Sequence, residues 1–201
     1  MMRSASFGAH QKPTIVDRFG RYLSSRTARR QVGNTNAAVT GDIGCGHDAK
    51  LALSVFANAA EIHLFDLTID EAITGDTIQR HIGPLPHTLV DLPDGMFDAL
   101  IFNNVLEHLV EPAETIAEIH RILKPGGRLF VNVPTWRGKV ALEFAAFKLG
   151  IAPAEEMEDH KIYYDKKTLW PALVSAGFRP SCIRMRTHKC GLNLYARVVK
   201  R

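Results

Sequence analysis

Apolar positions recur along the chain at two different spacings, and these spacings predict alternating strands and helices. Short apolar runs predict five strands, at residues 37–43, 61–66, 87–90, 97–103 and 128–133. Apolar residues three and four positions apart predict the intervening helices, at residues 49–57, 70–80 and 112–123. Strands that alternate with helices in this way favour a parallel sheet with helices on both of its faces.

The two ends of the chain depart from this alternation. Residues 1–13 are expected to be a loose tail, and residues 14–30 a helix. Its expected apolar face consists of Ile15, Val16, Phe19, Tyr22 and Leu23. Past residue 134, the pattern predicts a helix over 138–149 and a further helix with Thr168 as its N-cap. Two strands, at 180–187 and 192–199, are joined by a short loop and are predicted to form an antiparallel pair.

The predicted fold class is therefore α/β. We expect a Rossmann-like, doubly wound and mostly parallel sheet of seven strands, with a C-terminal antiparallel strand pair. Residues 1–36 are expected to be a tail and a helix that pack on the remainder. Residues 37–201 are expected to form a single domain, a size that suits a chain of 201 residues.

Composition narrows the class of protein. Apolar residues make up 46% of the chain and charged residues 23%, as in soluble globular proteins. No run of about 18 apolar residues is present, so no membrane span is expected. The first 12 residues lack the apolar core of a signal peptide. Three scattered cysteines, Cys45, Cys182 and Cys190, suit neither a disulfide framework nor a metal site. We therefore expect a cytoplasmic protein without a metal.

The net charge of +4 hides an asymmetry along the chain. Residues 1–38 carry a net charge of +6, residues 39–135 carry −9 and residues 136–201 carry +7. Basic ends of this kind can attract an acidic substrate, a phosphorylated carrier or an anionic membrane surface. Ordinary solvated lysines and arginines remain the alternative interpretation.

A glycine-containing loop is the strongest local motif. The first strand runs directly into Asp42-Ile43-Gly44-Cys45-Gly46, and a helix follows. Glycines at such a turn let the backbone approach a ligand closely. Asp66 closes the next strand, 20 residues past Gly46, a spacing at which a carboxylate accepts hydrogen bonds from ribose hydroxyls. By itself the loop also fits a dinucleotide site, with Ala49 in the last small position.

Further motifs follow the loop in a specific order. Phe97-Asp98-Ala99-Leu100 opens the fourth strand, Val105-Leu106-Glu107-His108-Leu109 follows it, and Leu123-Lys124-Pro125-Gly126-Gly127 precedes the fifth. Together with the glycine loop and the closing strand pair, this order resembles the class I S-adenosylmethionine-dependent methyltransferases, most closely the small bacterial type 11 and type 23 groups. The resemblance covers roughly residues 37–199, and it implies an S-adenosylmethionine-binding methyltransferase domain over residues 37–201.

The resemblance implies a cofactor site at matching positions. S-adenosylmethionine is the implied cofactor and S-adenosylhomocysteine the product. The implied cofactor-binding residues are Asp42, Gly44, Cys45 and Gly46 for the methionine part, Asp66 and Leu67 for ribose and adenine, Asp91 and Leu92 for the adenine edge, and Asn103 and Asn104 for the amino acid end. Two residues depart from the family pattern. Asp48 replaces the third glycine, where it either weakens cofactor binding or caps the next helix, and Gly41 replaces a large aliphatic residue.

The resemblance also suggests where methyl transfer takes place. Glu107 and His108 follow the fourth strand, and His160 precedes an aromatic pair as in the type 23 group, so His160 is the candidate base. A histidine bonded only to its own loop is the alternative. Residues 135–165 are the expected substrate cover. Direct in-line transfer to a small-molecule, sugar, lipid-linked or carboxylate acceptor, free or carrier-bound and possibly acidic, is the expected reaction.

Other functions stay open at this point. Asn103-Asn104-Val105-Leu106 differs from the motif used to methylate base amino groups, and no aromatic and basic platform is evident, so nucleic acid is an improbable partner. The first alternative is a catalytically inactive methyltransferase-like module that binds a partner. The second is a nicotinamide-dependent Rossmann enzyme, against which the C-terminal strand pair argues.

Overall fold

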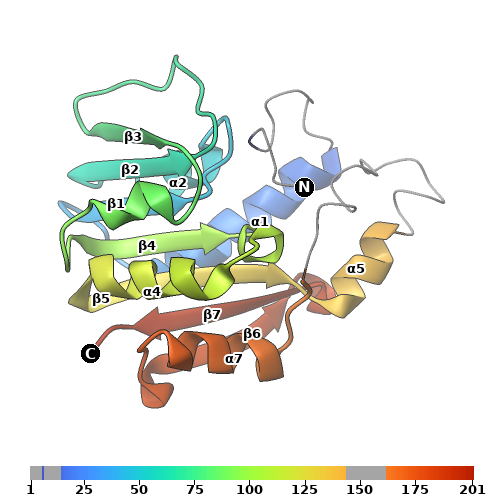
Figure 1. Cartoon of the computed structure of the whole chain (residues 1–201). Helices are drawn as coiled ribbons and strands as arrows, with labels where there is room; N and C mark the ends of the chain where they lie inside the picture. Colours follow the sequence, from blue (N-terminus) through green and yellow to red (C-terminus); the bar gives the residue numbers. More distant parts are fainter. Residues whose placement is uncertain (1–5, 7–14, 144–161) are drawn as a thin grey trace.

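The computed structural model of this chain describes residue 6 and residues 15–143 and 162–201, arranged around one seven-stranded sheet (Figure 1). The strands are β1 (Val39–Ile43), β2 (Glu61–Asp66), β3 (Ile78–Ile82), β4 (Phe97–Asn103), β5 (Leu123–Pro134), β6 (Ile183–His188) and β7 (Asn193–Val199). The α-helices are α1 (Ile15–Val32), α2 (Lys50–Val55), α3 (His87–Val90), α4 (Pro112–Ile122), α5 (Trp136–Glu143) and α7 (Lys166–Ser175). Short 3₁₀ turns are η1 (Leu106–His108), η3 (Pro180–Cys182) and η4 (Lys189–Gly191).

The sheet has the order β3-β2-β1-β4-β5-β7-β6. The first five strands pair in parallel, whereas β7 runs antiparallel to both β5 and β6. This topology confirms the predicted fold class, including the C-terminal antiparallel pair. An all-parallel dinucleotide-binding sheet has no such inserted strand, so the arrangement also disfavours the nicotinamide-dependent alternative.

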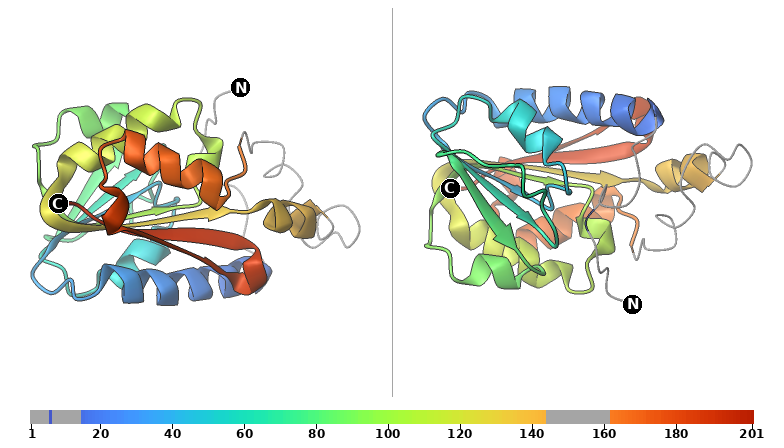
Figure 2. Two further views of the ribbon diagram at one scale, coloured as in Figure 1. Left: turned by 90° about the horizontal axis from the view of Figure 1, so that it is seen from below. Right: turned by 90° about the horizontal axis from the view of Figure 1, so that it is seen from above.

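Helices cover both faces of the sheet. Figure 2 shows α1 and α2 on one face and α3, α4 and α7 on the other. Strand β4 is buried on both sides, because Ala99 and Ile101 pack in the cluster under α1 and α2 while Leu100 and Phe102 pack in the cluster under α4 and α7. An apolar run covered on both faces is typical of a central parallel strand.

One predicted helix and one predicted strand are wrong. Residues 70–80 contain turns and the start of β3 instead of a helix, and His87–Val90 forms the single turn of α3 instead of a strand. Strand β3 is an edge strand with a half-exposed, polar sequence, so it lacks the apolar alternation by which strands are identified. Pro86 directly precedes α3, and proline favours the first turn of a helix.

The first helix exposes two of the aromatic residues that its sequence predicts to be buried, and Leu23 of the same face is half-buried. Phe19 and Tyr22 are 63% and 60% exposed, whereas Ser24, Ala28 and Val32 are buried against the sheet. Small side chains let the helix axis approach the sheet closely, so the large ones point outward.

The last helix begins earlier than predicted. Asp165 is its N-cap and accepts hydrogen bonds from the backbone N–H groups of Lys167 and Thr168. Thr168 instead completes a capping box by accepting from the N–H of Asp165. The residue expected as the cap is therefore the third residue of α7.

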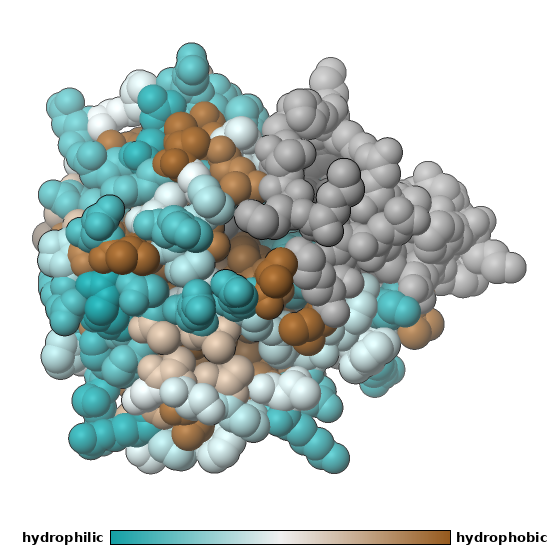
Figure 3. Space-filling model, viewed as in Figure 1, coloured by the Kyte–Doolittle hydropathy of each residue, from teal (hydrophilic) through white to brown (hydrophobic). Residues whose placement is uncertain are grey.

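The described surface is a mosaic. On the face that carries α4 and α7, hydrophobic residues form separate patches among hydrophilic ones (Figure 3). None of the described helices is long and apolar enough to cross a bilayer. The described residues also contain no group of three side chains that could hold a metal ion.

Candidate functional site

The carboxyl ends of β1, β2 and β4 meet at one edge of the sheet, which we call the carboxyl edge. Because these strands pair in parallel and in register, Ile43 lies beside both Phe65 and Phe102. The residues at and just after these strand ends are thereby brought together. Asp66 and Asn103 are the last residues of β2 and β4, Gly44 is the first residue after β1, and all three were predicted site residues.

The loop after β1 is pressed against the residue that follows β4. Gly44 and Gly46 have φ angles of +75° and +74°, which only glycine adopts without strain. A Cβ atom on Gly44 would lie 2.2 Å from Cγ2 of Val105. Cys45 is buried in this loop, and its thiol pKa is raised by burial and by the charge of Asp42. Burial thus favours the thiol over the thiolate, which is the form that acts as a nucleophile.

Asp66 is held rigidly at the end of β2. Its carboxylate accepts hydrogen bonds of 2.7 Å from the backbone N–H groups of Gly46 and Leu67. The hydroxyl group of Ser6 also donates to this carboxylate, and the same hydroxyl accepts a 2.7 Å hydrogen bond from the N–H of Thr68. An N-terminal serine thus occupies hydrogen-bonding capacity on the carboxylate that is predicted to bind ribose.

Asp42 is a buried carboxyl group at the same edge. Within the described part of the chain, neither of its side-chain oxygens has a hydrogen bond of ordinary geometry, although the backbone of Ala52 interacts with the group and acts to lower its pKa. Burial, followed by the charge of Asp66, raises the pKa of Asp42 to about 8. Buried polar groups are nearly always paired in folded proteins, and unpaired, strongly shifted ones cluster at functional sites.

Asp48, which replaces the third glycine, is turned toward α1. Its carboxylate forms ion pairs of 2.8 Å with Arg21 and 2.9 Å with Lys50, and it accepts only a long, 3.4 Å hydrogen bond from the first N–H of α2. Burial alone would raise the pKa of Asp48, but these hydrogen bonds and the charge of Arg21 lower it. The N-cap of α2 is Ala49. Asp48 therefore acts mainly as an ion-pair partner and not as the predicted helix cap.

Gly41, the second residue that departs from the family pattern, lies where neighbouring side chains already fill the space. A Cβ atom at this position would lie 2.8 Å from Cδ2 of Leu100, 3.2 Å from Cε1 of Phe97 and 3.4 Å from Cε2 of Phe65. The side chains of Phe65 from β2 and of Phe97 and Leu100 from β4 fill the space that a larger residue at position 41 would occupy. Glycine at this position is therefore a packing requirement.

The structure does not bring Asp91 and Leu92 to this edge. Asp91 ends α3, and the carbonyl of Leu92 accepts a 2.6 Å hydrogen bond from Arg121 at the end of α4. Arg121 also forms a 2.7 Å ion pair with Asp94, just before β4 begins. These residues lie at the opposite, amino end of the strands. The alignment of Asp91 and Leu92 with an adenine-edge loop therefore has no support in this arrangement.

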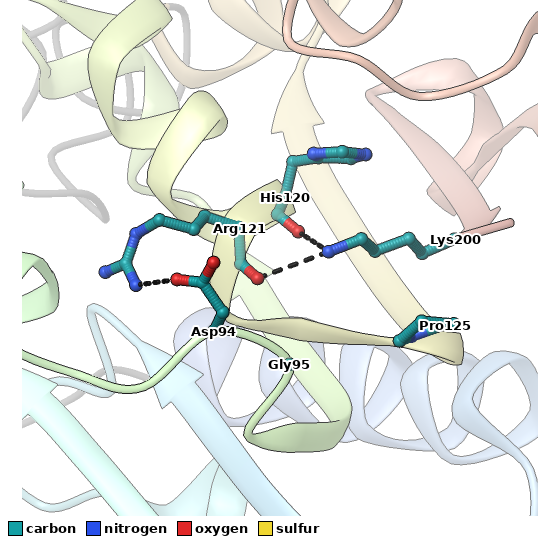
Figure 4. Close-up of a pocket in the computed structure, with 6 residues that line it drawn as sticks. All are labelled: Asp94, Gly95, His120, Arg121, Pro125 and Lys200. Carbon is teal, nitrogen blue, oxygen red and sulfur yellow. Dashed lines mark hydrogen bonds and ion pairs between the residues drawn. The ribbon is translucent and has the colours of Figure 1, made fainter.

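An open pocket of about 460 Å³ lies at that opposite end, and its lining residues are bonded to one another (Figure 4). Lys200 donates hydrogen bonds of 2.6 Å and 2.8 Å to the carbonyls of His120 and Leu123. A lysine that satisfies the last carbonyls of a helix is a C-terminal cap. This pocket is a structural junction between α4 and the last strand.

A polar network centred on the buried Asn132 and Asn193 lies beside the predicted amino acid end of the site. Asn132 donates hydrogen bonds of 3.0 Å and 2.8 Å to the side-chain oxygens of Asn103 and Asn104, and Asn193 donates to Asn104 at 3.3 Å. The side-chain oxygen of Asn132 lies 2.7 Å from Nε2 of His188. Sequence reasoning found Asn103 and Asn104 but missed the other three, although a polar residue inside the apolar strand β5 was a signal for Asn132.

His188 and Lys189 form the outer part of this network. Burial, followed by the charge of Lys189, lowers the pKa of His188 to about 4, so at neutral pH the ring is uncharged and its Nε2–H donates to Asn132. Burial lowers the pKa of Lys189 to about 8. Lys189 has a φ angle of +50°, which holds its backbone in a strained conformation at the carboxyl edge.

The candidate catalytic residues are only partly described. Glu107 and His108 lie in η1, directly after β4, and Glu107 is buried. Its carbonyl accepts a 3.3 Å hydrogen bond from the N–H of Ile162, and burial together with the charge of Glu107 raises the pKa of Tyr164 to about 12. His160 and residues 144–161 of the expected substrate cover lie outside the described residues.

Comparisons with known proteins show which proteins the chain resembles. Residues 41–131 match the family model described as a methyltransferase domain. A ubiquinone biosynthesis O-methyltransferase of Xylella fastidiosa is 30% identical over 123 residues, which cover 57% of this chain and 46% of that protein. The chain spans less than half the length of the curated relatives it matches.

Solved structures share the fold at lower identity. An S-adenosylmethionine-dependent methyltransferase of Archaeoglobus fulgidus has a TM-score of 0.66 and 14% identity, covering 90% of this chain and 94% of that one. A Burkholderia thailandensis 1,6-didemethyltoxoflavin-N1-methyltransferase, solved with S-adenosylhomocysteine, has a TM-score of 0.65 and 16% identity, with coverage of 92% and 80%. Residues 41–131 therefore match a methyltransferase domain, and the sheet order and these likenesses show that the chain shares the fold of S-adenosylmethionine-dependent methyltransferases.

Proposed function

We propose that this protein binds S-adenosylmethionine at the carboxyl edge and transfers its methyl group directly to a small or carrier-linked acceptor. The observation that carries the proposal is the preorganised carboxylate of Asp66, fixed by the N–H groups of Gly46 and Leu67 at 2.7 Å. This carboxylate would lie beside the ribose of a cofactor whose remaining part contacts the glycine loop after β1.

The residues present fit such a cofactor. The loop of Gly44 and Gly46 carries no side chain toward a ligand, and the carboxyl group of Asp42 lies buried beside it. When bound, the cofactor supplies a methyl group that its sulfonium makes electrophilic. A cationic ligand near Asp42 would favour the ionised carboxylate, because an opposite charge lowers the pKa of an acid.

Polar groups around the end of β4 lie beside the predicted amino acid end of the cofactor, from which the acceptor would be approached. Asn104 is held in a left-handed conformation, with φ of +55°, by hydrogen bonds from Asn132 and Asn193. Such a fixed constellation can orient an acceptor oxygen, and orientation alone contributes roughly 7–11 kcal/mol in favourable cases. Glu107 and His108 are the nearby candidates for positioning or proton transfer, and His160 remains the proposed base.

An oxygen acceptor is the class we favour. The Xylella relative is named as an O-methyltransferase, and direct transfer to a hydroxyl requires a base to take up the proton. A hydroxyl of a small molecule, a sugar or a lipid-linked acceptor would need such a base, whereas a carboxylate acceptor is already ionised and would not.

The cofactor proposal is tested by calorimetric titration with S-adenosylhomocysteine. We expect micromolar binding by the wild-type protein and at least a tenfold loss in Asp66→Ala, because the ribose hydroxyls lose a charged acceptor. Asp94→Ala removes an exposed carboxylate at the opposite end of the sheet and serves as the matched control. Absence of binding by folded protein would instead favour a catalytically inactive, partner-binding module.

A further inference from the structure

The outward face of α1 combines exposed cations with exposed aromatic rings. The helix sequence contains five arginines against one aspartate. Arg18, Arg26 and Arg30 are exposed, as are Phe19 and Tyr22 at 63% and 60%. Burying Phe19 and Tyr22 would stabilise the fold, but α1 packs on the sheet through the small residues of its opposite face. The exposed aromatic and charged side chains of α1 are therefore free to contact another surface.

A groove beside α1 extends the positive charge. It has a volume of about 880 Å³ and lies between α1 and the start of α2, lined by Arg21, Arg26, Arg30 and Lys50 among others. Asp48 is the acid that pairs with Arg21 and Lys50 here, which leaves Arg26 and Arg30 without a counter-ion among the described residues. The groove is thus suited to anionic groups of phosphate size.

The aromatic end of α1 lies beside the carboxyl edge. A Cβ on Gly20 of α1 would lie 3.9 Å from the amino group of Lys189 in η4. The hydroxyl of Thr135, the residue before α5, donates a 2.8 Å hydrogen bond to the carbonyl of Gly191 in η4. Turn η4 therefore contacts both α1 and the start of α5. Both views of Figure 2 show the start of α1 next to η4, with α5 projecting beyond the same edge.

Helix α5, which projects beyond the carboxyl edge, also exposes apolar side chains. Trp136 and Val140 are 59% and 64% exposed. The amino group of Lys139 lies 5.6 Å from the centre of the Trp136 ring. Aromatic and aliphatic tips with basic groups around them are the composition of helices that lie in the interface of a bilayer.

We propose that α1, with α5 as a second contact, binds the surface of an anionic membrane. The arginines of α1 contact lipid phosphates, and Phe19 and Tyr22 enter the interfacial layer. The exposed aliphatic side chain of Val140 favours lipid over nucleic acid, because an aliphatic group cannot stack on a base as an aromatic ring does. Together with the proposed function, on which this last point rests, the arrangement places the site next to an acceptor held in the membrane.

The test is sedimentation of the full chain with vesicles of phosphatidylcholine, with and without phosphatidylglycerol. We expect binding only to the anionic vesicles and a steep decrease with added salt. Each arginine near such a surface contributes enough that Arg26→Glu/Arg30→Glu should lower partitioning by at least about 30-fold. Phe19→Ser/Tyr22→Ser should lower it by about tenfold, because the apolar contact is lost.

A matched control separates local contact from net charge. Arg179→Glu/Arg186→Glu makes the same charge change at exposed positions near β6 and should retain most of the binding. Equal loss in this control, equal binding to neutral vesicles, or tighter binding to a single-stranded oligonucleotide than to anionic vesicles would each overturn the proposal. Titration of Arg26→Glu/Arg30→Glu with S-adenosylhomocysteine should be unchanged, so failure of membrane binding is distinguishable from failure of the cofactor proposal.

Discussion

Replacing Ser6 with alanine should strengthen cofactor binding, because its hydroxyl group and a ribose hydroxyl compete for one carboxylate. Ser6 is buried, donates to Asp66 and accepts a 2.7 Å hydrogen bond from the N–H of Thr68. It lies 60 residues from Asp66 in sequence. The contact therefore has to be broken before a ribose can take the same place.

The size of the effect follows from this competition. A hydrogen bond to a charged group contributes about 1.5–3 kcal/mol, and the loss of side-chain freedom of Ser6 offsets part of it. If about 1.4 kcal/mol remains, the site is open in roughly one molecule in ten, and the apparent affinity is lowered about tenfold. We therefore expect Ser6→Ala to bind S-adenosylhomocysteine about two- to tenfold more tightly than wild type.

Calorimetric titration of wild type, Ser6→Ala and Ser6→Thr would measure this effect. Threonine keeps the hydroxyl group and should stay close to wild type, and Ser181→Ala, at an exposed position, controls for a generic serine loss. Weaker binding by Ser6→Ala would mean that Ser6 belongs to the cofactor site. Unchanged affinity would mean that the contact does not oppose the ligand, and either result would refute the reasoning.

Three further predictions concern stability and pH. Gly44→Ala combines a left-handed backbone with a 2.2 Å clash and should destabilise by about 2–5 kcal/mol in urea unfolding. Gly126→Ala, with φ of +82° and open space around its Cβ, should cost only about 1–2 kcal/mol, and equal losses would contradict the packing argument. Asp42 has a pKa of about 8 in the folded chain and about 3.9 when unfolded, so the unfolded state ionises first and stability should fall as pH rises from about 4 to about 8. Asp42→Asn should remove that fall, and an unchanged pH profile of the urea midpoint would count against the buried acid. Lys200→Met removes donors to the carbonyls at the end of α4 and should cost about 1–2 kcal/mol, without changing the affinity for S-adenosylhomocysteine.

The sequence by itself determined the order of most elements and the centre of the site. Apolar runs of the right length identify β1, β2, β4 and β5, because a parallel strand covered on both faces cannot tolerate many polar residues. Once those strands are parallel neighbours, the residues at their carboxyl ends must meet at one edge. Gly44, Asp66 and Asn103 could be grouped for that reason, although they are far apart in the chain.

Only the tertiary structure decided contacts that have no local signature. The edge strand β3 lacks an apolar pattern, and the outward orientation of Phe19 and Tyr22 depends on what the sheet accepts. The bond between Asn132 and His188 joins residues 56 positions apart, and that between Ser6 and Asp66 joins residues 60 apart. Periodicity reports which residues share a face of one element, but the partner of that face is set by the packing of the whole chain.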